Sequence, residues 1–417
     1  MPWGTRDRWW HELLGHADPS RLPLMLDSET PFLLAYTSGT TGTPKAAVHV
    51  HGGFLVKVAQ EAHFQVDMHA RDVLHWVTDM GWIMGPWEVI GAHANGGTLV
   101  MYEGAPDYPG PERLWKLVDD HGVTILGVSP TLIRSLKTKG DEPVHAASRS
   151  TLRVFGSTGE PWNTEPYLWL FDVVGERRCP IINLSGGTEV GACFLSPTPL
   201  TALKPGTLGG PALGMAMEIR DVDGNPLGPG EGVGELVCTK PWPSMTRGFW
   251  GPGGRERYLE TYWSRWPGVW VHGDWASIDD DGLWFLHGRS DDTMNVAGKR
   301  IGPAEYESIL VDHESVAEAA VIGVPHDVKG EAVWCYVVLG PGRRASDRLR
   351  LVLADMISER LGKAFRPAQV RFVRALPRTR SAKIVRRAIR AAALGKELED
   401  TSMIENPESL RGIADAN

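Results

Sequence analysis

Three clusters rich in Ser, Thr and Gly each follow an apolar run of strand length, and this arrangement constrains the fold more than any other feature of the sequence. The clusters are TSGTTGTPK (37–45) after residues 32–36, GSTGEP (156–161) after 152–155, and SGGTE (185–189) after 180–184. Short apolar runs that stop at polar, Gly-rich segments are typical of buried strands. Open α/β sheets bind ligands beyond the carboxyl ends of their strands. We therefore predict that the three clusters lie at one edge of a mostly parallel sheet.

The composition is that of an ordinary globular protein. The chain has 417 residues, of which 42% are apolar and 23% charged, and this length suggests two or three domains. The formal net charge of −8 argues against a general nucleic-acid binder. The four cysteines form no C-x-x-C pair, so we expect neither a zinc ribbon nor a disulfide framework. The sequence has no recognisable signal peptide or membrane-spanning run, and we expect a cytoplasmic protein without a membrane partner.

The pattern of apolar residues changes twice along the chain. Up to about residue 205, helical stripes such as 111–121 alternate with strand-like runs such as 123–128, which indicates parallel strands with crossover helices. Short apolar pieces between turn signals then favour antiparallel strands. The expected fold class is α/β, with a large domain over 1–289 whose β-rich part covers about 205–288, a small α/β domain over 291–400 and a tail over 401–417.

The first cluster suits an oxyanion chain such as a triphosphate, because its hydroxyls and glycines supply donors and allow close backbone approach. It is not a Walker A loop, since Pro44 precedes Lys45 and Ala46 follows it. In the third cluster, Glu189 could hold Mg²⁺ through its carboxylate oxygens. Each cluster taken alone also fits a plain polar turn. Their occurrence in one predicted sheet favours a nucleotide site.

Two features outside the clusters could also contact a nucleotide. Asp274 and Arg289 stand at the end of the β-rich part, where an acid could accept hydrogen bonds from ribose hydroxyls, and a surface turn is the alternative. Residues 378–390 carry six basic side chains. This run fits a solvated helix face, a nucleic-acid patch or, through Lys383 in a loop before the helix, a contact to a distant phosphate.

Metal-protease and hydrolase functions are not supported. The histidines of HELLGH (11–16) are five rather than four residues apart, so they would not share a helix face. A G-x-S-x-G motif is also missing from the sequence, which leaves an α/β-hydrolase without its nucleophile.

Taken in order, the motifs resemble those of the adenylate-forming superfamily, and most closely the AMP-forming acyl-CoA synthetases of the acetyl-, propionyl- and acetoacetyl-CoA synthetase branch. The resemblance runs from about residue 6 to the end of the chain. It rests on YTSGTTGTPK (36–45), DMGWIMG (79–85), GSTGEP (156–161), SGGTE (185–189), HGDWA (272–276), GRSDDTMNVAGKRIGPAE (288–305) and RTRSAKIVRR (378–387). It implies an acid–thiol ligase that uses ATP, Mg²⁺ and coenzyme A. A carboxylate would attack ATP to give acyl-AMP and pyrophosphate, and coenzyme A would then displace AMP.

The resemblance also implies roles for individual residues. Lys383 would bridge the carboxylate and the α-phosphate, and Thr188 and Glu189 would act near it, with Glu189 on Mg²⁺. The β- and γ-phosphates would be held by Thr37, Ser38, Gly39, Thr40, Thr41, Gly42 and Lys45. Adenine would be contacted by Gly159, Glu160 and Pro161, and the length of the nucleotide would be lined by Asn183, Leu184, Ser185, Gly186 and Gly187. The ribose would be bound by Asp274 and Arg289, and a phosphate by Arg300.

The same resemblance implies a moving small domain and an acyl pocket. Rotation about Asp291 would withdraw Lys383 and bring Gly298 to the pantetheine channel for the second step. The implied acyl pocket comprises Trp82, Ile83, Thr158 and Gly186, and a second candidate metal site comprises Val311, His313 and Val316.

The chain departs from the family pattern in two respects. Ser185 and Gly186 stand where acetyl-CoA synthetases carry tryptophans, which leaves room for several carbons and implies a short-chain carboxylate of the acetate, propionate or acetoacetate class. Relative to the family, the chain begins within the large domain, so we expect an N-terminally incomplete product. A truncated nucleotide-binding remnant and an adenylation enzyme that loads a carrier-protein thiol are the alternatives. An acyltransferase or deacylase acting on Lys383 is an expected protein partner.

Overall fold

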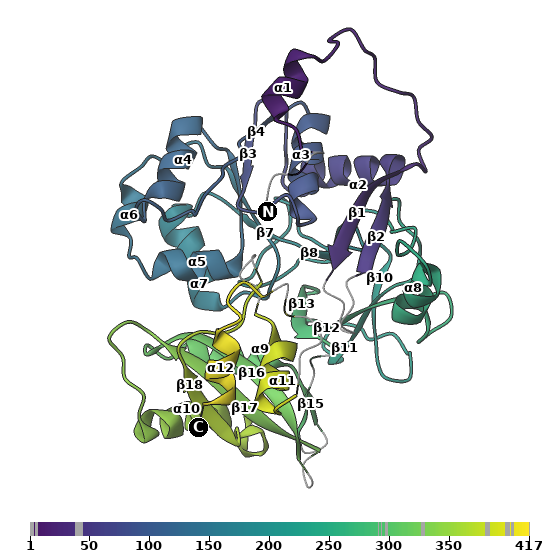
Figure 1. Cartoon of the computed structure of the whole chain (residues 1–417). Coiled ribbons are helices and arrows are strands. Elements are labelled where there is room, and N and C mark those ends of the chain that lie inside the picture. Colours follow the sequence, from purple (N-terminus) through teal and green to yellow (C-terminus); the bar gives the residue numbers. More distant parts are fainter. Residues whose placement is uncertain are drawn as a thin grey trace.

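The computed structural model describes residues 4, 7–37, 45–290, 292, 294–296, 299–326, 330–379, 384–396, 401 and 404–416, with the backbone alone at positions 37, 295, 299 and 300. A large part of the molecule contains a parallel sheet, an antiparallel sheet and two short hairpins, and a smaller lobe follows it along the chain (Figure 1). Within these residues, no helix is both long and apolar enough to cross a membrane.

The parallel sheet confirms the predicted alternation of strands and helices. All its strands are parallel and run in the order β4 (Thr98–Leu99), β3 (Val73–Trp76), β5 (Ile125–Val128), β6 (Val154–Ser157) and β7 (Ile181–Asn183). Helices bury both of its faces. One face carries α2 (His51–Phe64) and α3 (Met84–Ala94), and the other carries α4 (Arg113–His121), α5 (Pro130–Lys137), α6 (Glu142–His145), α7 (Thr164–Trp169) and a π-helical turn (Leu170–Val174) (Figure 1). Such double coverage explains the continuous apolar runs of these strands.

Local sequence signals place the ends of these helices. Helix α4 stops at Gly122, whose φ of 60° lies in the left-handed region that glycine adopts without strain. Helix α5 starts after Ser129, whose side chain accepts a hydrogen bond from the Leu132 N–H, and Pro130 occupies its first turn.

The segment 205–288 forms the antiparallel sheet that its turn signals predict. The strand order is β10 (Met217–Arg220), β11 (Val233–Cys238), β12 (Trp270–Ile278) and β13 (Trp284–Arg289). Helix α8 (Gly254–Trp263) packs against β12, where the rings of Tyr258 and Tyr262 contact the fully buried Trp270. A further hairpin joins β8 (Ser185–Gly187) to β9 (Ala192–Leu195).

The strand before the first cluster differs from its prediction. β1 (Pro31–Thr37) pairs antiparallel with β2 (Lys45–Val50) in a separate two-stranded sheet. β2 is buried along its whole length, whereas Phe32, Leu34 and Tyr36 of β1 are 36%, 36% and 62% exposed. The prediction of a buried strand at 32–36, and of three clusters following strands of one sheet, is therefore wrong for the first cluster. A short apolar run does not reveal which strand it pairs with.

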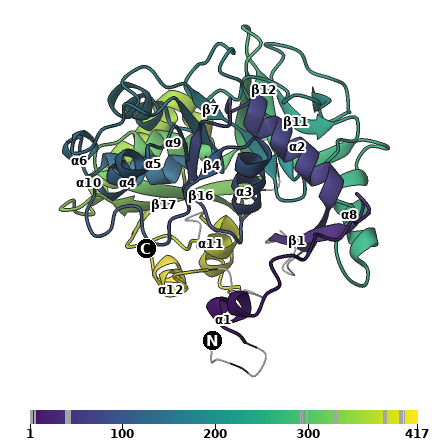
Figure 2. The ribbon, with the colours of Figure 1, turned by 90° about the horizontal axis from the view of Figure 1, so that it is seen from above.

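The smaller lobe has its own sheet and core. Its strands are β15 (Lys299–Ile301), β14 (Met294–Val296), β17 (Gly330–Leu339) and β16 (Val316–His326) in that order, with β18 (Gln369–Val373) parallel to β17. One face of this sheet packs against α9 (Pro303–Val311) and α10 (Asp347–Leu361), and the other face packs against α11 (Arg386–Ala393) and α12 (Ser409–Ala414). A 3₁₀ turn (Lys363–Phe365) follows α10. At the other end of the chain, α1 (Trp10–Gly15) buries no residue and stands away from the body (Figure 2).

Candidate active site

The second and third clusters meet as predicted. β6 and β7 are parallel neighbours, with Gly156 opposite Ile182 and Ser157 opposite Asn183. The segments 156–161 and 185–189 therefore leave the sheet side by side at its carboxyl edge, which is where open α/β sheets bind ligands.

The first cluster is described only at its two ends. Ser38, Gly39, Thr40, Thr41 and Gly42 lie outside the described residues, as does the side chain of Thr37. Lys45 opens β2 and is buried. Its Nζ donates a hydrogen bond to Thr261 Oγ1 at 3.1 Å and lies 5.4 Å from the centre of the Phe249 ring. The ammonium at the end of this cluster is therefore held by α8 and the segment before it.

Strand β2 is joined to the Thr188–Glu189 turn by buried hydrogen bonds. His49 Nε2 donates to the Thr188 carbonyl at 2.7 Å. Thr246 bridges the two segments, since its N–H donates to the Glu189 carbonyl at 3.1 Å and its hydroxyl bonds both the N–H and the carbonyl of Val48 at 3.0 Å. Burial lowers the pKa of His49, which keeps the ring neutral. The first and third clusters thus form one unit although they follow strands of different sheets.

Glu189 is buried at the centre of this unit. Tyr262 of α8 lies near its carboxylate, and burial, followed by the charge of Glu189, raises the pKa of the Tyr262 hydroxyl. Tyr262 in turn stacks on Trp270, with ring centres 4.0 Å apart and an angle of 9° between the planes. A buried carboxylate is a suitable ligand for a hard cation such as Mg²⁺.

The predicted ribose pair lies beside this unit. Asp274 and Arg289 face each other across β12 and β13, with 3.6 Å between Asp274 Oδ1 and Arg289 Nη1. Arg289 Nη1 also donates to the His272 carbonyl at 2.9 Å. The His272 ring reaches back to the third cluster, because a Cβ added at Gly187 would lie 2.7 Å from its Cε1. Asp274 therefore presents a carboxylate, held by a guanidinium, next to the Ser185–Glu189 segment.

The residues predicted at adenine have their side chains engaged elsewhere. Glu160 forms an ion pair with Arg134 at 2.6 Å and accepts a hydrogen bond from the Thr131 N–H at 2.8 Å, and these contacts lower its pKa against the opposing effect of burial. Gly159 has a φ of 107°, which favours glycine. The Glu160 side chain thus anchors the loop, and the backbone of Gly159–Pro161 is the part free to face a base.

The residues predicted along the nucleotide divide in the same way. Asn183 Nδ2 donates to the carbonyls of Gly206 and Thr207 at 3.3 and 3.2 Å, and Leu184 is buried in the core. The side chains of Asn183 and Leu184 therefore pack inside the protein and support the segment that leads into β8. Only the backbone of these two positions, and the Ser185–Gly187 strand, can line a ligand.

The predicted acyl pocket contains one position without space for a side chain. A Cβ at Gly186 would lie 1.9 Å from the Ala192 carbonyl oxygen. Trp82 and Ile83 lie at the start of α3, and Thr158 directly follows β6. The β8–β9 hairpin therefore requires glycine at 186, and a larger residue there would need a different hairpin geometry.

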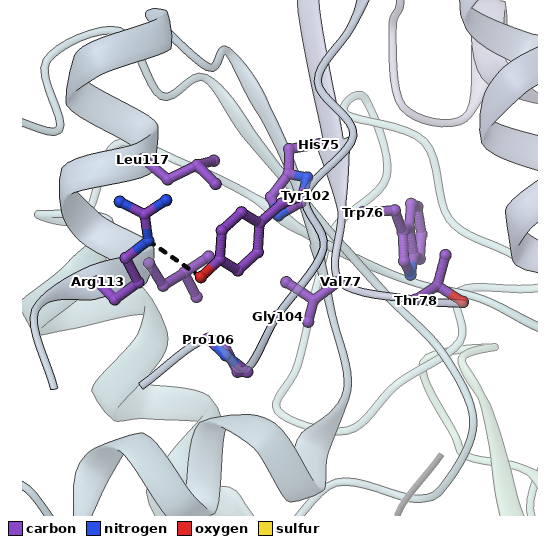
Figure 3. Close-up of a pocket in the computed structure, with 10 residues that line it drawn as sticks. His75, Trp76, Val77, Thr78, Tyr102, Gly104, Pro106, Arg113 and Leu117 are labelled. Atoms are coloured by element: carbon purple, nitrogen blue, oxygen red, sulfur yellow. Dashed lines mark hydrogen bonds between the residues drawn. The ribbon is translucent and has the colours of Figure 1, made fainter. Parts of the chain in front are cut away.

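A separate hollow opens at the end of β3 (Figure 3). Arg113 Nε donates to the Tyr102 hydroxyl at 3.2 Å on one side of it, and the His75 ring bonds the Val100 carbonyl at 2.9 Å on the other. Its lining comprises His75, Trp76, Val77, Thr78, Tyr102, Gly104, Pro106, Arg113, Leu114 and Leu117. None of these is a predicted acyl-pocket residue, so this hollow is not the predicted acyl pocket.

Sequence reasoning missed a buried ion pair beneath the β8–β9 hairpin. Glu61 is fully buried and accepts hydrogen bonds from the Cys193 N–H at 2.7 Å and from Trp87 Nε1 at 3.0 Å. Lys57 Nζ lies 3.4 Å from Glu61 Oε1 and donates to the Leu213 carbonyl at 2.6 Å. One carboxylate therefore ties α2 to α3 and to the strand that pairs with Gly186. The only sequence signal was a pair of opposite charges four positions apart on this helix.

In the smaller lobe, Lys383, Asp291 and Gly298 lie outside the described residues, and of Arg300 only the backbone is described, in β15. Arg386, three residues after Lys383, forms a two-pronged contact with Glu307 of α9 at 2.8 and 2.5 Å, and its Nη1 lies 3.8 Å from Asp292. The basic run is extensively neutralised in this way, since Arg378 pairs with Glu318 and Arg390 with Glu331. These ion pairs leave little support for a nucleic-acid patch.

The second candidate metal site lies beside a hollow that several arginines line. Val311, His313 and Val316 lie between α9 and β16, where the His313 carbonyl accepts from the Val316 N–H at 2.8 Å. The hollow at His313 is also lined by Arg343, Arg344 and Arg348, and Arg343 forms an ion pair with Glu314 at 3.2 Å. Among the described residues, no group of three or more His, Cys, Asp or Glu side chains could hold a metal ion.

Comparison with known proteins decides the family. The model of the family described as AMP-binding enzyme matches residues 5–250, more than half of the chain. The chain belongs to the AMP-binding enzyme family. The model of the AMP-binding enzyme C-terminal domain matches residues 305–383. The family resemblance inferred from the motifs is thereby confirmed.

Several proteins that are similar to this chain are named as acyl-CoA synthetases. The acetyl-coenzyme A synthetase of Syntrophus aciditrophicus is 43% identical over 98% of the chain, and acetyl-coenzyme A synthetase 2 of Pseudomonas aeruginosa is 42% identical over 100% of it. The solved acetoacetyl-CoA synthetase from Streptomyces lividans matches 97% of the chain with a TM-score of 0.88 and 30% identity, which confirms the expected α/β fold class. The chain spans 63% and 65% of the two curated relatives and 62% of the solved structure.

Proposed function

We propose that the chain activates a short-chain carboxylate with ATP to form acyl-AMP and pyrophosphate, and transfers the acyl group to coenzyme A. The cluster of Lys45, Thr188 and Glu189 beside the Asp274–Arg289 pair is the observation that carries this proposal. It offers a phosphate-binding end and a ribose-binding end next to each other at the edge of a sheet. Family membership and the names of the similar synthetases support the same reaction, and we infer that it takes place in the cytoplasm.

The first half-reaction brings two anions together. A carboxylate oxygen attacks the α-phosphorus of ATP, a new P–O bond forms, and the bond to pyrophosphate breaks. Positive groups must offset the repulsion in the transition state. Lys383 would contact the carboxylate and the α-phosphate, while Lys45 and its loop hold the outer phosphates. Glu189 would hold Mg²⁺, which neutralises phosphate charge when bound with ATP.

The second half-reaction takes place at the acyl carbon of the adenylate, where the thiol of coenzyme A replaces AMP. The thiolate of coenzyme A attacks the acyl carbon, and the bond to AMP breaks. Asp274 and Arg289 keep AMP in place during this exchange. Rotation of the smaller lobe about Asp291 would withdraw Lys383 and bring Gly298 to the thiol.

Exchange of labelled pyrophosphate into ATP, stimulated by small carboxylates, tests the proposal. We expect stimulation by at least one of acetate, propionate, butyrate and acetoacetate, and formation of a thioester when free coenzyme A is added. Silence with all four would contradict the substrate class. A thioester formed only on a carrier-protein thiol would contradict the second step.

Replacement of Lys383 separates the half-reactions. Lys383→Ala should lower the pyrophosphate exchange rate by roughly 100-fold or more, because it removes a charge that acts in the first transition state. Thioester formation from supplied acyl-AMP should persist. Lys396→Ala, an exposed lysine of the same lobe, is the matched control and should leave both rates unchanged. Equal loss of both half-reactions in Lys383→Ala would contradict the assigned role.

A further inference from the structure

We infer that the buried carboxylate of Glu61 positions two walls of the acyl pocket and thereby sets which carboxylates the chain accepts. Three of the residues implied for this pocket, Trp82, Ile83 and Gly186, lie at the start of α3 and in the β8–β9 hairpin. Both of these elements donate a hydrogen bond to the same carboxylate. This inference deepens the proposed function and rests on it.

The first connection runs through Trp87 of α3. Its indole Nε1 donates to Glu61 Oε2 at 3.0 Å, and its backbone N–H donates to the Ile83 carbonyl at 3.0 Å, one turn earlier. The Trp87 ring is buried and meets the Trp76 ring edge-on, with 5.3 Å between the ring centres. Close packing leaves this indole little room to turn. The Glu61 carboxylate therefore sets where the first turn of α3 holds Ile83.

The second connection runs through Cys193 of β9, which pairs with Gly186 of β8. The Cys193 N–H donates to Glu61 Oε1 at 2.7 Å. The hairpin bulges at this point, since Phe194 stands between two paired residues of β9 without an opposite residue on β8. A bulge bends its strand and changes where the neighbouring residues point. Gly186 has no room for even a methyl group against β9, so a shift of β9 must move this wall of the pocket.

The carboxylate is itself held by a buried ammonium. Lys57 Nζ lies 3.4 Å from Glu61 Oε1, and the two side chains are 3% and 0% exposed. The ammonium also donates to the Leu213 carbonyl at 2.6 Å and to Gln60 Oε1 at 2.8 Å. Desolvation opposes an ion pair in a core, and neutral side chains of similar size are often as stable or more stable there. A role in positioning therefore accounts for this pair better than stability does.

The contacts of Glu61 point to an effect on the carboxylate substrate rather than on the nucleotide. Within the part of the chain that the structure describes, the partners of its carboxylate are Lys57, Trp87 and Cys193. None of these belongs to the phosphate-binding or the ribose-binding end. We therefore expect the ion pair to set discrimination among carboxylates and to have little effect on the use of ATP.

Pyrophosphate exchange by the whole chain with acetate, propionate and butyrate tests the inference. Glu61→Gln alone would leave the Lys57 ammonium buried without its counter-charge, so the test uses the double variant Lys57→Met/Glu61→Gln, which buries no charge. The amide has one acceptor oxygen for two donors, so one wall loses its support. The ratio of kcat/KM between the best and the poorest of the three acids should fall about fivefold, because a pocket discriminates by about 10-fold to 200-fold for each methylene group. The KM for ATP should change less than about twofold.

Matched variants separate positioning from a loss of folding. Trp87→Phe keeps an aromatic ring and removes the Nε1 donor, so it should lower the same ratio about twofold to threefold. This variant remains informative if urea unfolding shows that the double variant does not fold. Glu112→Gln breaks a more exposed ion pair of the same i, i+4 spacing, to Lys116 at 3.1 Å, and should keep the ratio of the parent.

Several outcomes would overturn the inference alone. These are the ratio of the parent in a folded double variant or in Trp87→Phe, a KM for ATP that rises as much as the ratio falls, and a parent that does not discriminate among the three acids. A parent chain that catalyses no exchange with any carboxylate would overturn the proposed function and this inference with it.

Discussion

The phosphate-binding end and the ribose-binding end of the candidate site are built in different ways. The ribose end consists of Asp274 and Arg289, which face each other on adjacent strands and depend only on the register of β12 with β13. The phosphate end combines β2, the Thr188–Glu189 turn, the segment at Thr246 and α8. Its members come from distant parts of the chain and are buried. A change at the ribose end should therefore affect binding alone, whereas a change at the phosphate end should affect binding and stability together.

Asp274→Asn is the change with the largest expected effect on binding. It removes a charged acceptor for the ribose hydroxyls, so the affinities for ATP and AMP should fall together by roughly 10-fold to 100-fold. The free energy of unfolding should change by about 1 kcal/mol or less, since Arg289, the other member of the pair, is 36% exposed and solvent weakens such an ion pair. Titration calorimetry and urea unfolding measure the two quantities. Asp280→Asn, in the exposed turn that follows β12, is the control, and a large loss of stability in Asp274→Asn would remove the distinction between the two ends.

Thr246→Val tests the opposite case. It removes the hydroxyl that bridges Val48, and the free energy of unfolding should fall by about 1–2 kcal/mol because buried backbone groups lose a partner. ATP affinity should fall more than AMP affinity. Thr246→Ser keeps the hydroxyl and should behave as the parent in urea unfolding and calorimetry. Full stability of Thr246→Val would show that the phosphate end is less dependent on this bridge than its hydrogen bonds indicate.

A pH series gives the smallest expected effect. In the folded chain, burial lowers the pKa of His49 below its ordinary value of 6.5. As the pH drops below 6.5, the unfolded chain therefore binds a proton that the folded chain does not. Stability should therefore fall as the pH drops below 6.5, by up to about 1 kcal/mol from this group. His49→Gln cannot take up the proton and still offers a donor to Thr188. Urea unfolding at pH 7 and pH 5 should show a weaker pH dependence in this variant.

The exposed His145→Gln is the control for the pH series, and it should retain the pH dependence of the parent. An identical pH dependence in His49→Gln and the parent would contradict the assignment. The difference between the phosphate-binding end and the ribose-binding end would then be supported by the nucleotide affinities alone.

The two ends also differ in how far the sequence could predict them. Asp274, Arg289 and the strands before the second and third clusters follow from local patterns, since strand register and turn chemistry involve neighbouring residues. His49 bonds a residue 139 positions away, and Lys45 one 216 positions away. No local periodicity reports such contacts, so Tyr262, Thr246 and His49 were not predicted. The Glu61–Lys57 pair was missed for the same reason, because its partners lie on another helix and a strand.

The exposed face of β1 shows a related limit. Its apolar run has the length of a core strand, and yet β2, which carries Lys45 and His49 among alanines and valines, is the buried member of the pair. The hydrophobicity of one run therefore does not report which of two paired strands is buried. Burial of β2 follows from its partners, Thr246 and the segment around Phe249, which are about 200 residues further along the chain.

One contact between the two lobes has a consequence for the proposed rotation. Asn163 Nδ2, just after the second cluster, donates to Ser308 Oγ of α9 at 3.0 Å. Because Arg386 clamps α9 to the stretch that follows Lys383, a swing of the lobe that carries the lysine away must also pull Ser308 from Asn163. A neutral hydrogen bond contributes only about 0.5–1.5 kcal/mol, within reach of thermal fluctuation. This hydrogen bond would then favour one orientation of the smaller lobe only weakly, and it would break without a contribution from a bound ligand.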